Sequence, residues 1–308
     1  MEIYLPIAEQ SMNVFVLLGL GGAAGLLAGM FGVGGGFLAT PLLIFVGIPP
    51  AVAVASQANQ VVANSVSSLQ VQWRRGNVDL RMGLILLLGG MVGSSAGVTL
   101  FTYLKRIGQI DFVIAVLYVV MLSAIGSLML FESVSTWFKR RRNPQAPRGK
   151  LHTHYLVHRL PFKMRFYKSK LYISALLPLG LGFFIGILSA ILGVGGGFVL
   201  VPAMIYLLGM PTTVVIGTSN FQILFVAANV TFLQAATNGT VDVVLALLLI
   251  LGGVVGAPIG ARIAAKLPGV VLRGLMAVLV LAVAVELLTE LLRTPASPYS
   301  LGVRETGP

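Results

Sequence analysis

Residues 32–37 read Gly-Val-Gly-Gly-Gly-Phe, and the same six residues return 161 positions later at 193–198. Each block lies inside a long apolar run. Glycine destabilises a helix interior by about 1 kcal/mol relative to alanine, so three consecutive glycines predict a break in each run. Internal duplication with a broken helix at the same place in both halves is typical of secondary transporters.

The correspondence between the halves extends beyond the glycine blocks. The same offset of 161 pairs Pro41 with Pro202, Pro50 with Pro211, and Asn59 with Asn220. After a slip of two residues, Asp79 pairs with Asp242, and a series of glycines follows in both halves. The two homologous repeats therefore cover residues 13–131 and 172–292.

The composition indicates a membrane protein. The chain has 308 residues, of which 57% are hydrophobic and 10% are charged, and its mean hydropathy is +0.95. A soluble domain carries about 25% charged residues, so we exclude a soluble globular enzyme. No cysteine is present, and the three histidines all lie within residues 152–158. We therefore expect no catalytic activity, no metal site and no cofactor.

Eight apolar runs organise the sequence, at residues 13–46, 51–73, 80–103, 110–131, 172–208, 211–234, 242–266 and 270–292. A helix crosses the hydrocarbon core with about 20 residues, and six of the runs fit one crossing each. The first and fifth runs are too long and contain the glycine blocks, so each should form a helix, a break and a shorter helix. The sequence thus predicts an all-α polytopic membrane protein with eight to ten helices in two repeats.

A basic segment joins the repeats. Residues 133–172 hold 11 Lys and Arg and no acidic residue, while the rest of the chain holds 10 basic and 9 acidic residues. Because cytoplasmic loops are enriched in Lys and Arg, we expect a cytoplasmic linker that contacts anionic lipid headgroups rather than nucleic acid. The predicted domains are a first repeat at 1–131, this linker at 132–171, a second repeat at 172–292 and a polar tail at 293–308.

The placement of basic residues predicts inverted repeats. Basic residues flank two further loops, near residue 77 and at 267–270, which should also be cytoplasmic. With a cytoplasmic linker, this requires run 172–208 to enter and return as a hairpin, and both termini then lie outside. Lys105 and Arg106 lie on the wrong side in this scheme. The alternative treats each broken run as one crossing and gives parallel repeats with both termini inside.

The glycine blocks are the first candidate site. Helices that start near Phe37 and Phe198 would aim free backbone N–H groups and the positive end of the helix dipole at a bound anion. In that case Gly35→Ala and Gly196→Ala should weaken binding. The candidate residues are Gly34, Gly35, Gly36, Phe37, Gly195, Gly196, Gly197 and Phe198. The alternative is tight helix packing, which suits the other glycines Gly19, Gly21, Gly22, Gly25, Gly89 and Gly93.

A stripe of polar residues follows the first broken run. One polar side chain recurs every four residues, at Ser56, Gln60, Asn64, Ser68 and Gln72. Contact between such a stripe and lipid would be unfavourable, so the stripe should face the bundle interior. Neutral hydrogen-bond donors there suit an oxyanion that has to be released again. The candidate substrate-binding residues here and in the matching run of the second repeat are Gln57, Asn59, Gln60, Asn64, Thr218, Ser219, Asn220 and Gln222. The alternative is interhelical hydrogen bonding without a ligand.

Acidic residues at membrane depth would be candidates for proton coupling. Asp79, Asp111 and Asp242 lie at the ends of runs, so we expect interfacial or capping roles for them. Glu286 lies inside the last run and is the one candidate for a proton relay.

These features resemble the TauE/SafE family of membrane permeases, also called the sulfite exporter family. The resemblance covers residues 13–292 apart from the linker. The resemblance rests on the glycine blocks with Pro41 and Pro202, the stretch Gly217-Thr218-Ser219, and the run Arg-Gly-Asn-Val-Asp at 75–79. It implies a bacterial or archaeal cytoplasmic-membrane permease for sulfur-containing anions such as sulfite or sulfoacetate, usually moved outward. Residues 56–59, Ser-Gln-Ala-Asn, depart from the Thr-Ser pair that is frequent in the family, which bears on the substrate.

We therefore expect a secondary transporter that exports sulfite or an organosulfonate across the cytoplasmic membrane. The scarcity of buried acidic residues leaves an uncoupled anion channel as the alternative. A membrane scaffold without transport, in which the polar stripe only holds helices together, is the third hypothesis.

Overall fold

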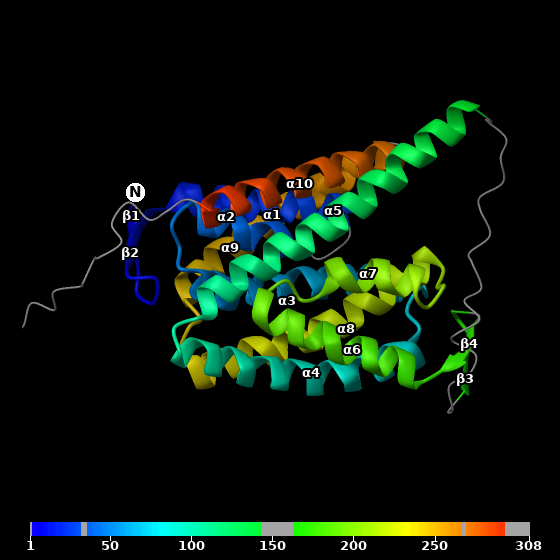
Figure 1. Cartoon of the computed structure of the whole chain (residues 1–308), viewed down its shortest axis with the longest axis horizontal. Coiled ribbons are helices and arrows are strands. Elements are labelled where there is room, and N and C mark those ends of the chain that lie inside the picture. Colours follow the sequence, from blue (N-terminus) through cyan, green and yellow to red (C-terminus); the bar gives the residue numbers. More distant parts are fainter. Residues whose placement is uncertain (1, 32–35, 143–162, 170, 267–268, 293–308) are drawn as a thin grey trace, which may run out of the picture.

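The computed structural model describes residues 2–31, 36–142, 163–169, 171–266 and 269–292. Within this part, ten α-helices, one short π-helix and two β-hairpins follow one another along the chain (Figure 1). The helices are α1 (Val14–Phe31), α2 (Gly36–Phe45), α3 (Pro50–Arg74), α4 (Leu80–Arg106), α5 (Ile110–Arg142), α6 (Leu176–Leu192), α7 (Gly197–Tyr206), α8 (Thr212–Leu233), the π-helix η2 (Gln234–Asn238), α9 (Val243–Lys266) and α10 (Gly269–Leu292). Five of them are long and apolar enough to cross a membrane, so the predicted all-α polytopic architecture is confirmed.

Both glycine-broken runs form two separate helices, as the sequence predicts. In the second repeat, Gly193, Gly195 and Gly196 adopt left-handed conformations between α6 and α7, with φ of 68°, 68° and 73°. A side chain would strain the backbone at each of these positions. The short helices α2 and α7 have ten residues each. That is about 15 Å of helix, half the thickness of the hydrocarbon core.

The two repeats have opposite orientations. One apolar cluster joins the hairpin β1–β2 to the connection before α3, through Leu5 and Ile48. A second cluster joins the hairpin β3–β4 to the connection before α8, through Phe166 and Met210. We call these two ends of the bundle the β1–β2 end and the β3–β4 end, and they lie on opposite sides in Figure 1. The equivalent helices α3 and α8 thus start at opposite ends, and the predicted inverted arrangement is confirmed.

Each broken run enters the bundle and returns to the end from which it came. Leu17, near the start of α1, and Leu43, near the end of α2, belong to the same cluster at the β1–β2 end. Leu177, near the start of α6, and Leu208, just after α7, pack together in the cluster at the β3–β4 end. The two tips, where α2 and α7 begin, therefore lie in the middle of the bundle.

The repeats interlock through parallel helix pairs. The most extensive contacts join α1 to α9 of the other repeat and α4 to α6. Glycines let the backbones touch, because a Cβ added to Gly25 would lie 2.5 Å from Gly253 Cα and one on Gly93 would overlap the Phe183 carbonyl. The packing interpretation is confirmed for five glycines, namely Gly21, Gly22, Gly25, Gly89 and Gly93. It is wrong for Gly19, where nothing lies within 4 Å of an added Cβ.

The sequence interpretation missed a β-hairpin at the start of each repeat. The strands β1 (Glu2–Leu5) and β2 (Gln10–Asn13) pair antiparallel, as do β3 (Lys163–Phe166) and β4 (Leu171–Ser174). Four-residue strands show too little alternation to be recognised from sequence. The hairpins are again 161 residues apart, so the repeats extend back to residues 2 and 163. The strand β3 thus lies inside the segment predicted as a linker, β4 begins at the last residue of that segment, and α5 reaches into it as far as Arg142.

Asp79 and Asp242 cap the fourth helix of each repeat, which confirms the capping roles predicted for them. The Oδ1 atom of each accepts a hydrogen bond from the backbone N–H three residues later. The second oxygen binds the hairpin of the other repeat. Asp79 Oδ2 accepts from Ser169 N and Oγ, and Asp242 Oδ2 accepts from Ile7 N. Each carboxylate therefore starts a helix and also joins the two repeats.

One pairing between the repeats differs from the sequence alignment. Pro49 precedes α3 at its N-cap and Pro211 precedes α8, with ψ of 133° and 132°. Pro49, rather than Pro50, is therefore the counterpart of Pro211, and the offset in these helices is 162. The cause is one additional residue in the connection before α8. The predicted pairing of Asn59 with Asn220 is wrong by one residue for the same reason.

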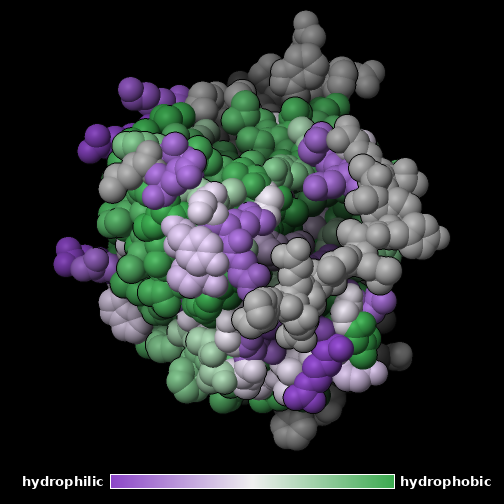
Figure 2. Space-filling model, turned by 90° about the vertical axis from the view of Figure 1, so that its left-hand side faces the viewer, coloured by the Kyte–Doolittle hydropathy of each residue, from purple (hydrophilic) through white to green (hydrophobic). Residues whose placement is uncertain are grey.

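The flanks of the bundle are apolar. Large hydrophobic side chains are exposed on the outer faces of the helices, among them Phe15, Val92, Leu128 and Phe232. Seen from the β1–β2 end, hydrophilic side chains gather on the face towards the viewer, whereas hydrophobic ones dominate the left-hand flank (Figure 2). Apolar flanks between polar ends are what a lipid bilayer requires of a helical bundle.

Candidate functional site

A cavity of about 430 Å³ lies between α1, α3, α8 and α9. Its polar lining comes from both repeats and consists of Asn64, Ser67, Ser68 and Gln72 of α3 and Asn220 of α8. Small residues of the interlocked pair, Gly29 of α1 and Ala257 of α9, belong to the rest of the lining. The second half of the predicted polar stripe therefore faces the bundle interior.

The cavity runs from a buried part to an exposed part along α3. Asn64 and Asn220 are 8% and 1% exposed, whereas Val71, two turns further along α3 and also in the lining, is 48% exposed. Because α3 ends at the β3–β4 end, the cavity opens towards that end of the bundle.

The described lining residues offer amides and hydroxyls but no charged side chain. Asn and Gln amides provide N–H donors, and serine provides an O–H donor. Asn220 Nδ2 donates to Ile216 O at 2.8 Å, one turn back in α8, which orients the amide. Such groups can hydrogen-bond the oxygens of an anion without the ion pairing that would retain it in the cavity.

The first half of the stripe holds helices together. Gln60 Nε2 donates to the backbone oxygens of Gly21 and Leu249, at 3.1 and 2.9 Å. Its Oε1 accepts a hydrogen bond from Gln57 Nε2 at 2.8 Å. These bonds link α3 to α1 and α9. They favour interhelical hydrogen bonding as the role of Gln57 and Gln60, and leave ligand contact to Asn64 and the residues beyond it.

Hydroxyl groups at matching positions of α3 and α8 bind the backbone N–H groups of the two capping aspartates. Ser56 Oγ accepts a hydrogen bond from Asp242 N at 3.0 Å, and Thr218 Oγ1 accepts one from Asp79 N at 3.0 Å. Each bond joins a helix of one repeat to the start of a helix in the other. The candidate Thr218 therefore has a structural partner in this conformation.

The remaining polar candidates of α8 are less firmly bound. Ser219 Oγ donates to Ile216 O within its own helix. Gln222, the counterpart of Gln60, is fully buried beside Gly90, and neither atom of its amide has a hydrogen-bond partner among the described residues.

Asn59 and Glu286 also lie outside the described cavity lining, to which only Asn64 and Asn220 of the candidates contribute. Asn59 is half-buried and donates to Ser56 O in its own helix, and it is not among the lining residues. Glu286 is exposed on α10, the helix that packs against α5, and α10 contributes no described residue to the lining.

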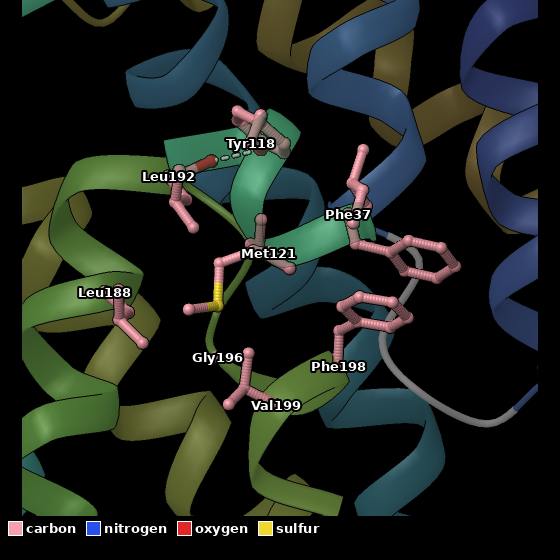
Figure 3. Close-up of a pocket in the computed structure, with 10 residues that line it drawn as sticks. Phe37, Tyr118, Met121, Leu188, Leu192, Gly196, Phe198 and Val199 are labelled. Atoms are coloured by element: carbon pink, nitrogen blue, oxygen red, sulfur yellow. Dashed lines mark hydrogen bonds between the residues drawn. The ribbon is translucent and has the colours of Figure 1, made fainter. Parts of the chain in front are cut away.

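The two half-helices α2 and α7 begin side by side. The ring of Phe37, at the start of α2, stacks on the ring of Phe198, at the start of α7, with centroids 4.3 Å apart and planes within 7° of parallel (Figure 3). The described ends of the two glycine blocks therefore meet inside the bundle. The candidates Gly34 and Gly35 lie outside the described residues.

Apolar side chains surround the second glycine block. A Cβ added to Gly195 would overlap Val61 and lie 2.8 Å from Ile223, and one added to Gly196 would overlap Ile185. The cavity beside Gly196 in Figure 3 measures about 10 Å³ and has an almost entirely apolar lining. That is about the room one water molecule needs. The described contacts of this block are therefore those of a packed core.

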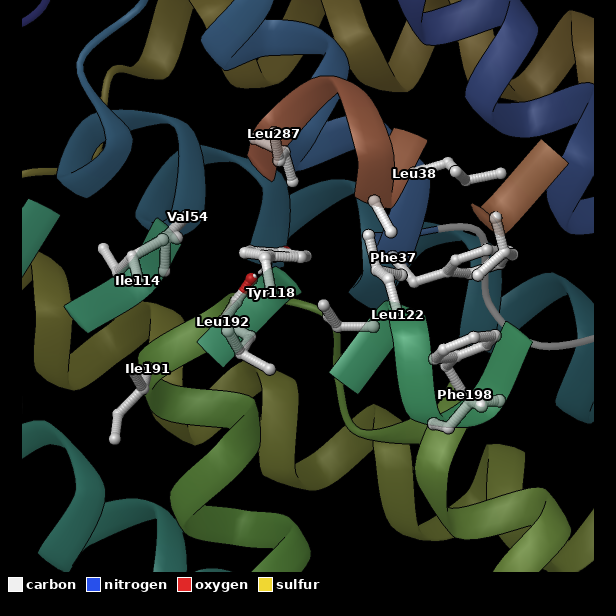
Figure 4. Packing of buried hydrophobic residues seen from close by; sticks show 14 of the residues in the cluster. Phe37, Leu38, Val54, Ile114, Tyr118, Leu122, Ile191, Leu192, Phe198 and Leu287 are labelled. Carbon is white, nitrogen blue, oxygen red and sulfur yellow. Dashed lines mark hydrogen bonds between the residues drawn. The ribbon is translucent and has the colours of Figure 1, made fainter. Parts of the chain in front are cut away.

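A cluster of buried side chains holds the broken helices in place (Figure 4). Phe37 and Phe198 pack there with Tyr118 and Leu122 of α5. The Tyr118 hydroxyl donates to the backbone oxygen of Leu192, the last residue of α6. The hydrogen bond satisfies a carbonyl that the helix break leaves without its intrahelical partner.

Sequence reasoning missed the apolar part of the cavity. Gly29, Ala257 and Pro258 line it, but nothing in the sequence of α1 or α9 reveals which helix of the other repeat each will contact. Sequence reasoning also placed Ser68 and Gln72 on the polar stripe without selecting them as site residues, and it did not select Ser67. The polar periodicity was the signal that could have selected them.

Comparison with known proteins identifies the family. The model of the family described as "Sulfite exporter TauE/SafE" matches residues 17–287. A "Probable membrane transporter protein" of Xylella fastidiosa strain 9a5c is 30% identical over 79% of this chain and 81% of its own length. "Probable membrane transporter protein YunE" of Bacillus subtilis strain 168 is 26% identical over 78% of this chain and 85% of its own length. No solved structure gives a significant match. The chain therefore belongs to the TauE/SafE sulfite exporter family of membrane transporters.

Proposed function

We propose that the protein is a secondary transporter that moves a small sulfur-containing oxyanion, such as sulfite or an organosulfonate, through the cavity at Asn64 and Asn220. The observation that carries the proposal is a cavity with uncharged amide and hydroxyl groups in its lining, between helices of two inverted repeats. Substrate sites of inverted-repeat transporters lie at the repeat interface near the middle of the membrane. The buried position of Asn64 and Asn220 fits such a site.

The proposed substrate follows from the lining and from the relatives. Amide and hydroxyl groups donate hydrogen bonds to anionic oxygens, and the described lining holds no carboxylate that would repel them. Sulfite is the anion named in the description of the matching family. It is therefore the first substrate to test.

We propose that the β3–β4 end faces the cytoplasm. Arg74, Arg75 and Arg81 lie at this end, and the hairpin β3–β4 adds Lys168, whose Nζ donates to the backbone oxygen of Gly76. The hairpin at the other end carries Glu2 and Glu9. Cytoplasmic segments of membrane proteins are enriched in Lys and Arg. In this orientation the cavity opens to the cytoplasm, the compartment from which an exported anion enters.

The glycine blocks remain a proposed second contribution to binding. The N-terminal ends of α2 and α7 carry partial positive charge that favours an anion. The apolar contacts of Gly195 and Gly196 support packing as their main role, so the polar cavity carries the proposal without them.

The test is anion flux into proteoliposomes that contain the purified protein. Sulfite, sulfate, thiosulfate, sulfoacetate and chloride are compared, each with and without a pH gradient across the membrane. We expect sulfite or sulfoacetate to be moved fastest and to respond to the gradient. Equal flux for all five anions, or no flux above that of protein-free liposomes, would contradict the proposal.

An uncoupled anion channel is the second candidate. The observation that favours it is the absence of any titratable side chain among the described lining residues. A channel would move sulfite at a rate that is independent of the pH gradient in the same assay, whereas a proton-coupled transporter would not.

Glu286→Gln is expected to leave sulfite flux largely intact. Glu286 is exposed on the outer surface of the bundle, so removal of its charge changes no group in the described cavity lining. The measurement compares initial flux rates and the response to a pH gradient for the variant and the unmodified protein. Complete loss of flux in a normally folded variant would give Glu286 the role of proton relay that the sequence first suggested.

A further inference from the structure

The cavity has a counterpart at the β1–β2 end of the bundle. The bounds of the equivalent helices give sequence offsets of 161 for α1 and α6, 162 for α3 and α8, and 163 for α4 and α9. These offsets relate each lining residue to one in the other repeat. The counterparts of Ser67, Ala257 and Pro258 are Asn229, Ser94 and Ser95, and the counterpart of Ala28 is Ser189.

At the counterpart, the helices are joined by hydrogen bonds. Asn229 Nδ2 donates to Ser94 Oγ at 2.9 Å and to Ser95 Oγ at 3.3 Å. These bonds join α8 to α4 directly. The corresponding helices α3 and α9 are separated there by the cavity.

Apolar side chains fill the rest of the counterpart. Ala58, Val98, Ala190 and Val230 form a buried cluster. Val230 is 0% exposed, whereas its counterpart Ser68 lines the open cavity and is half-buried. The same place in the two repeats is therefore closed in one and open in the other.

A second layer of polar bonds closes the β1–β2 end above this cluster. Asn238 Nδ2, in η2, donates to Gln234 Oε1 at 2.7 Å, and Thr102 Oγ1 donates to Asn238 Oδ1 at 3.0 Å. Lys105 Nζ donates to Asn238 O at 2.9 Å. This contact gives Lys105 a structural role at the β1–β2 end, where the predicted orientation places few basic residues. At the other end Gln72, the counterpart of Gln234, lines the cavity instead.

The closed region gathers the same kinds of donors as the cavity. Besides the Asn229 amide and two serine hydroxyls, it contains Ser189, which is 1% exposed and whose Oγ has no hydrogen-bond partner among the described residues. An unpartnered buried hydroxyl costs folding free energy. The Ser189 hydroxyl, one turn before the helix break at Gly193, is therefore available to a ligand in another conformation.

We infer that Ser94, Ser95, Ser189 and Asn229 form a second half-site for the transported oxyanion, closed in this conformation, and that it opens when the cavity at Asn64 and Asn220 closes. The inference rests on the proposed function. Homologous repeats can each adopt the packing that the other shows, so exchange of the two packings moves the opening from one end of the bundle to the other. Breaking the contacts of Asn229 should shift the population towards that second state.

The test uses thiols, because the chain contains no cysteine. Ser68→Cys and Val230→Cys place one thiol at each of two counterpart positions, and each is labelled in proteoliposomes with a charged maleimide supplied to both sides. No anion substrate is added. In the unmodified background, we expect the thiol at position 68 to react at least tenfold faster than that at position 230.

Asn229→Ala is then combined with each thiol. We expect labelling at position 230 to become at least tenfold faster and labelling at position 68 to become at least threefold slower, since opening of one end closes the other. Thr99→Ala is the control, because its hydroxyl donates only within α4 on an exposed face. It should change neither rate. Ser94→Ala removes an acceptor of the same contact and replaces Asn229→Ala if that variant does not fold.

Coupling of the two rates is the decisive observation. If labelling at position 230 accelerates while labelling at position 68 stays the same, Asn229 only packs a static end, and the inference is overturned. No change at either position overturns it as well. Because labelling needs no substrate, these outcomes are independent of the sulfite flux assay. Flux with uncoupled labelling retains the proposed function alone, and coupled labelling without flux of any tested anion rejects the proposed substrate.

Discussion

Asn220→Leu is expected to lower sulfite flux by about ten- to a hundredfold while the protein stays folded. Asn220 lines the buried part of the cavity and is 1% exposed. Loss of a hydrogen bond to a charged ligand costs about 1.5–3 kcal/mol, and each 1.4 kcal/mol is about a factor of ten in affinity. Leucine has a similar volume, so the packing of α8 should persist. Initial flux rates in proteoliposomes and the melting temperature in detergent measure the two effects separately.

Asn59→Leu is the matched control. Asn59 also donates to a backbone oxygen of its own helix, but it lies outside the cavity lining. We expect flux close to that of the unmodified protein. Equal losses in the two variants would support the sequence-based selection of Asn59 as a binding residue. Normal flux in Asn220→Leu would exclude the buried end of the cavity from the transport path.

The features predicted correctly from the sequence are those set by local chemistry. Three consecutive glycines weaken a helix wherever they occur, so the breaks between α1 and α2 and between α6 and α7 followed from residues 32–37 and 193–198 alone. A carboxylate at the start of an apolar run caps that helix, as Asp79 and Asp242 do. The distribution of Lys and Arg predicted the inverted orientation, because the enrichment of these residues on the cytoplasmic side sets the orientation of a segment independently of helix packing.

Features that depend on contacts between distant segments were not predictable in this way. The polar stripe of α3 is continuous in sequence, yet Gln60 binds two backbone oxygens, whereas Asn64, one turn later, lines a cavity. The difference arises because α1 and α9 approach each other closely at Gly21 and Leu249. That contact joins two repeats, and the residue pattern of one helix does not reveal which helix of the other repeat packs against it.

The one-residue error in the pairing of Asn59 with Asn220 has a similar origin. Alignment by the glycine blocks carries an offset of 161 into the next helix, but the connection before α8 is one residue longer than the one before α3. One residue rotates a helical position by about 100°. The error therefore paired Asn59 with a position on a different face of α8, and the N-cap prolines reveal it.

The difference between the two ends also lies beyond the sequence pattern. The counterparts Ser67 and Asn229 are both polar, and each sits on a helix that follows a broken run. One lines an open cavity and the other donates to two serines. The same pair of positions is therefore open in one repeat and closed in the other, although both residues are polar.

Gly196→Ala is expected to destabilise the folded protein by about 2–5 kcal/mol. Gly196 has a φ of 73°, a left-handed conformation that costs a non-glycine residue about 1–2 kcal/mol. The new Cβ would also overlap Ile185, a buried core residue, and such overpacking costs about 1–3 kcal/mol. The free energy of unfolding in detergent, from denaturant titration, measures the sum.

Gly209→Ala separates the two causes, because Gly209 has nearly the same φ of 71° but nothing within 4 Å of an added Cβ. It should lose only the backbone share, about 1–2 kcal/mol, and the difference between the variants then measures the overlap with Ile185. Sulfite affinity of the folded fraction decides what the glycine block does. Since the new methyl group would contact Ile185, and neither residue is among the described residues of the cavity lining, we expect that affinity to be unchanged. A loss of tenfold or more in Gly196→Ala, with none in Gly209→Ala, would instead show that the block contacts the anion, and the transport path would then pass through the apolar core between α2 and α7.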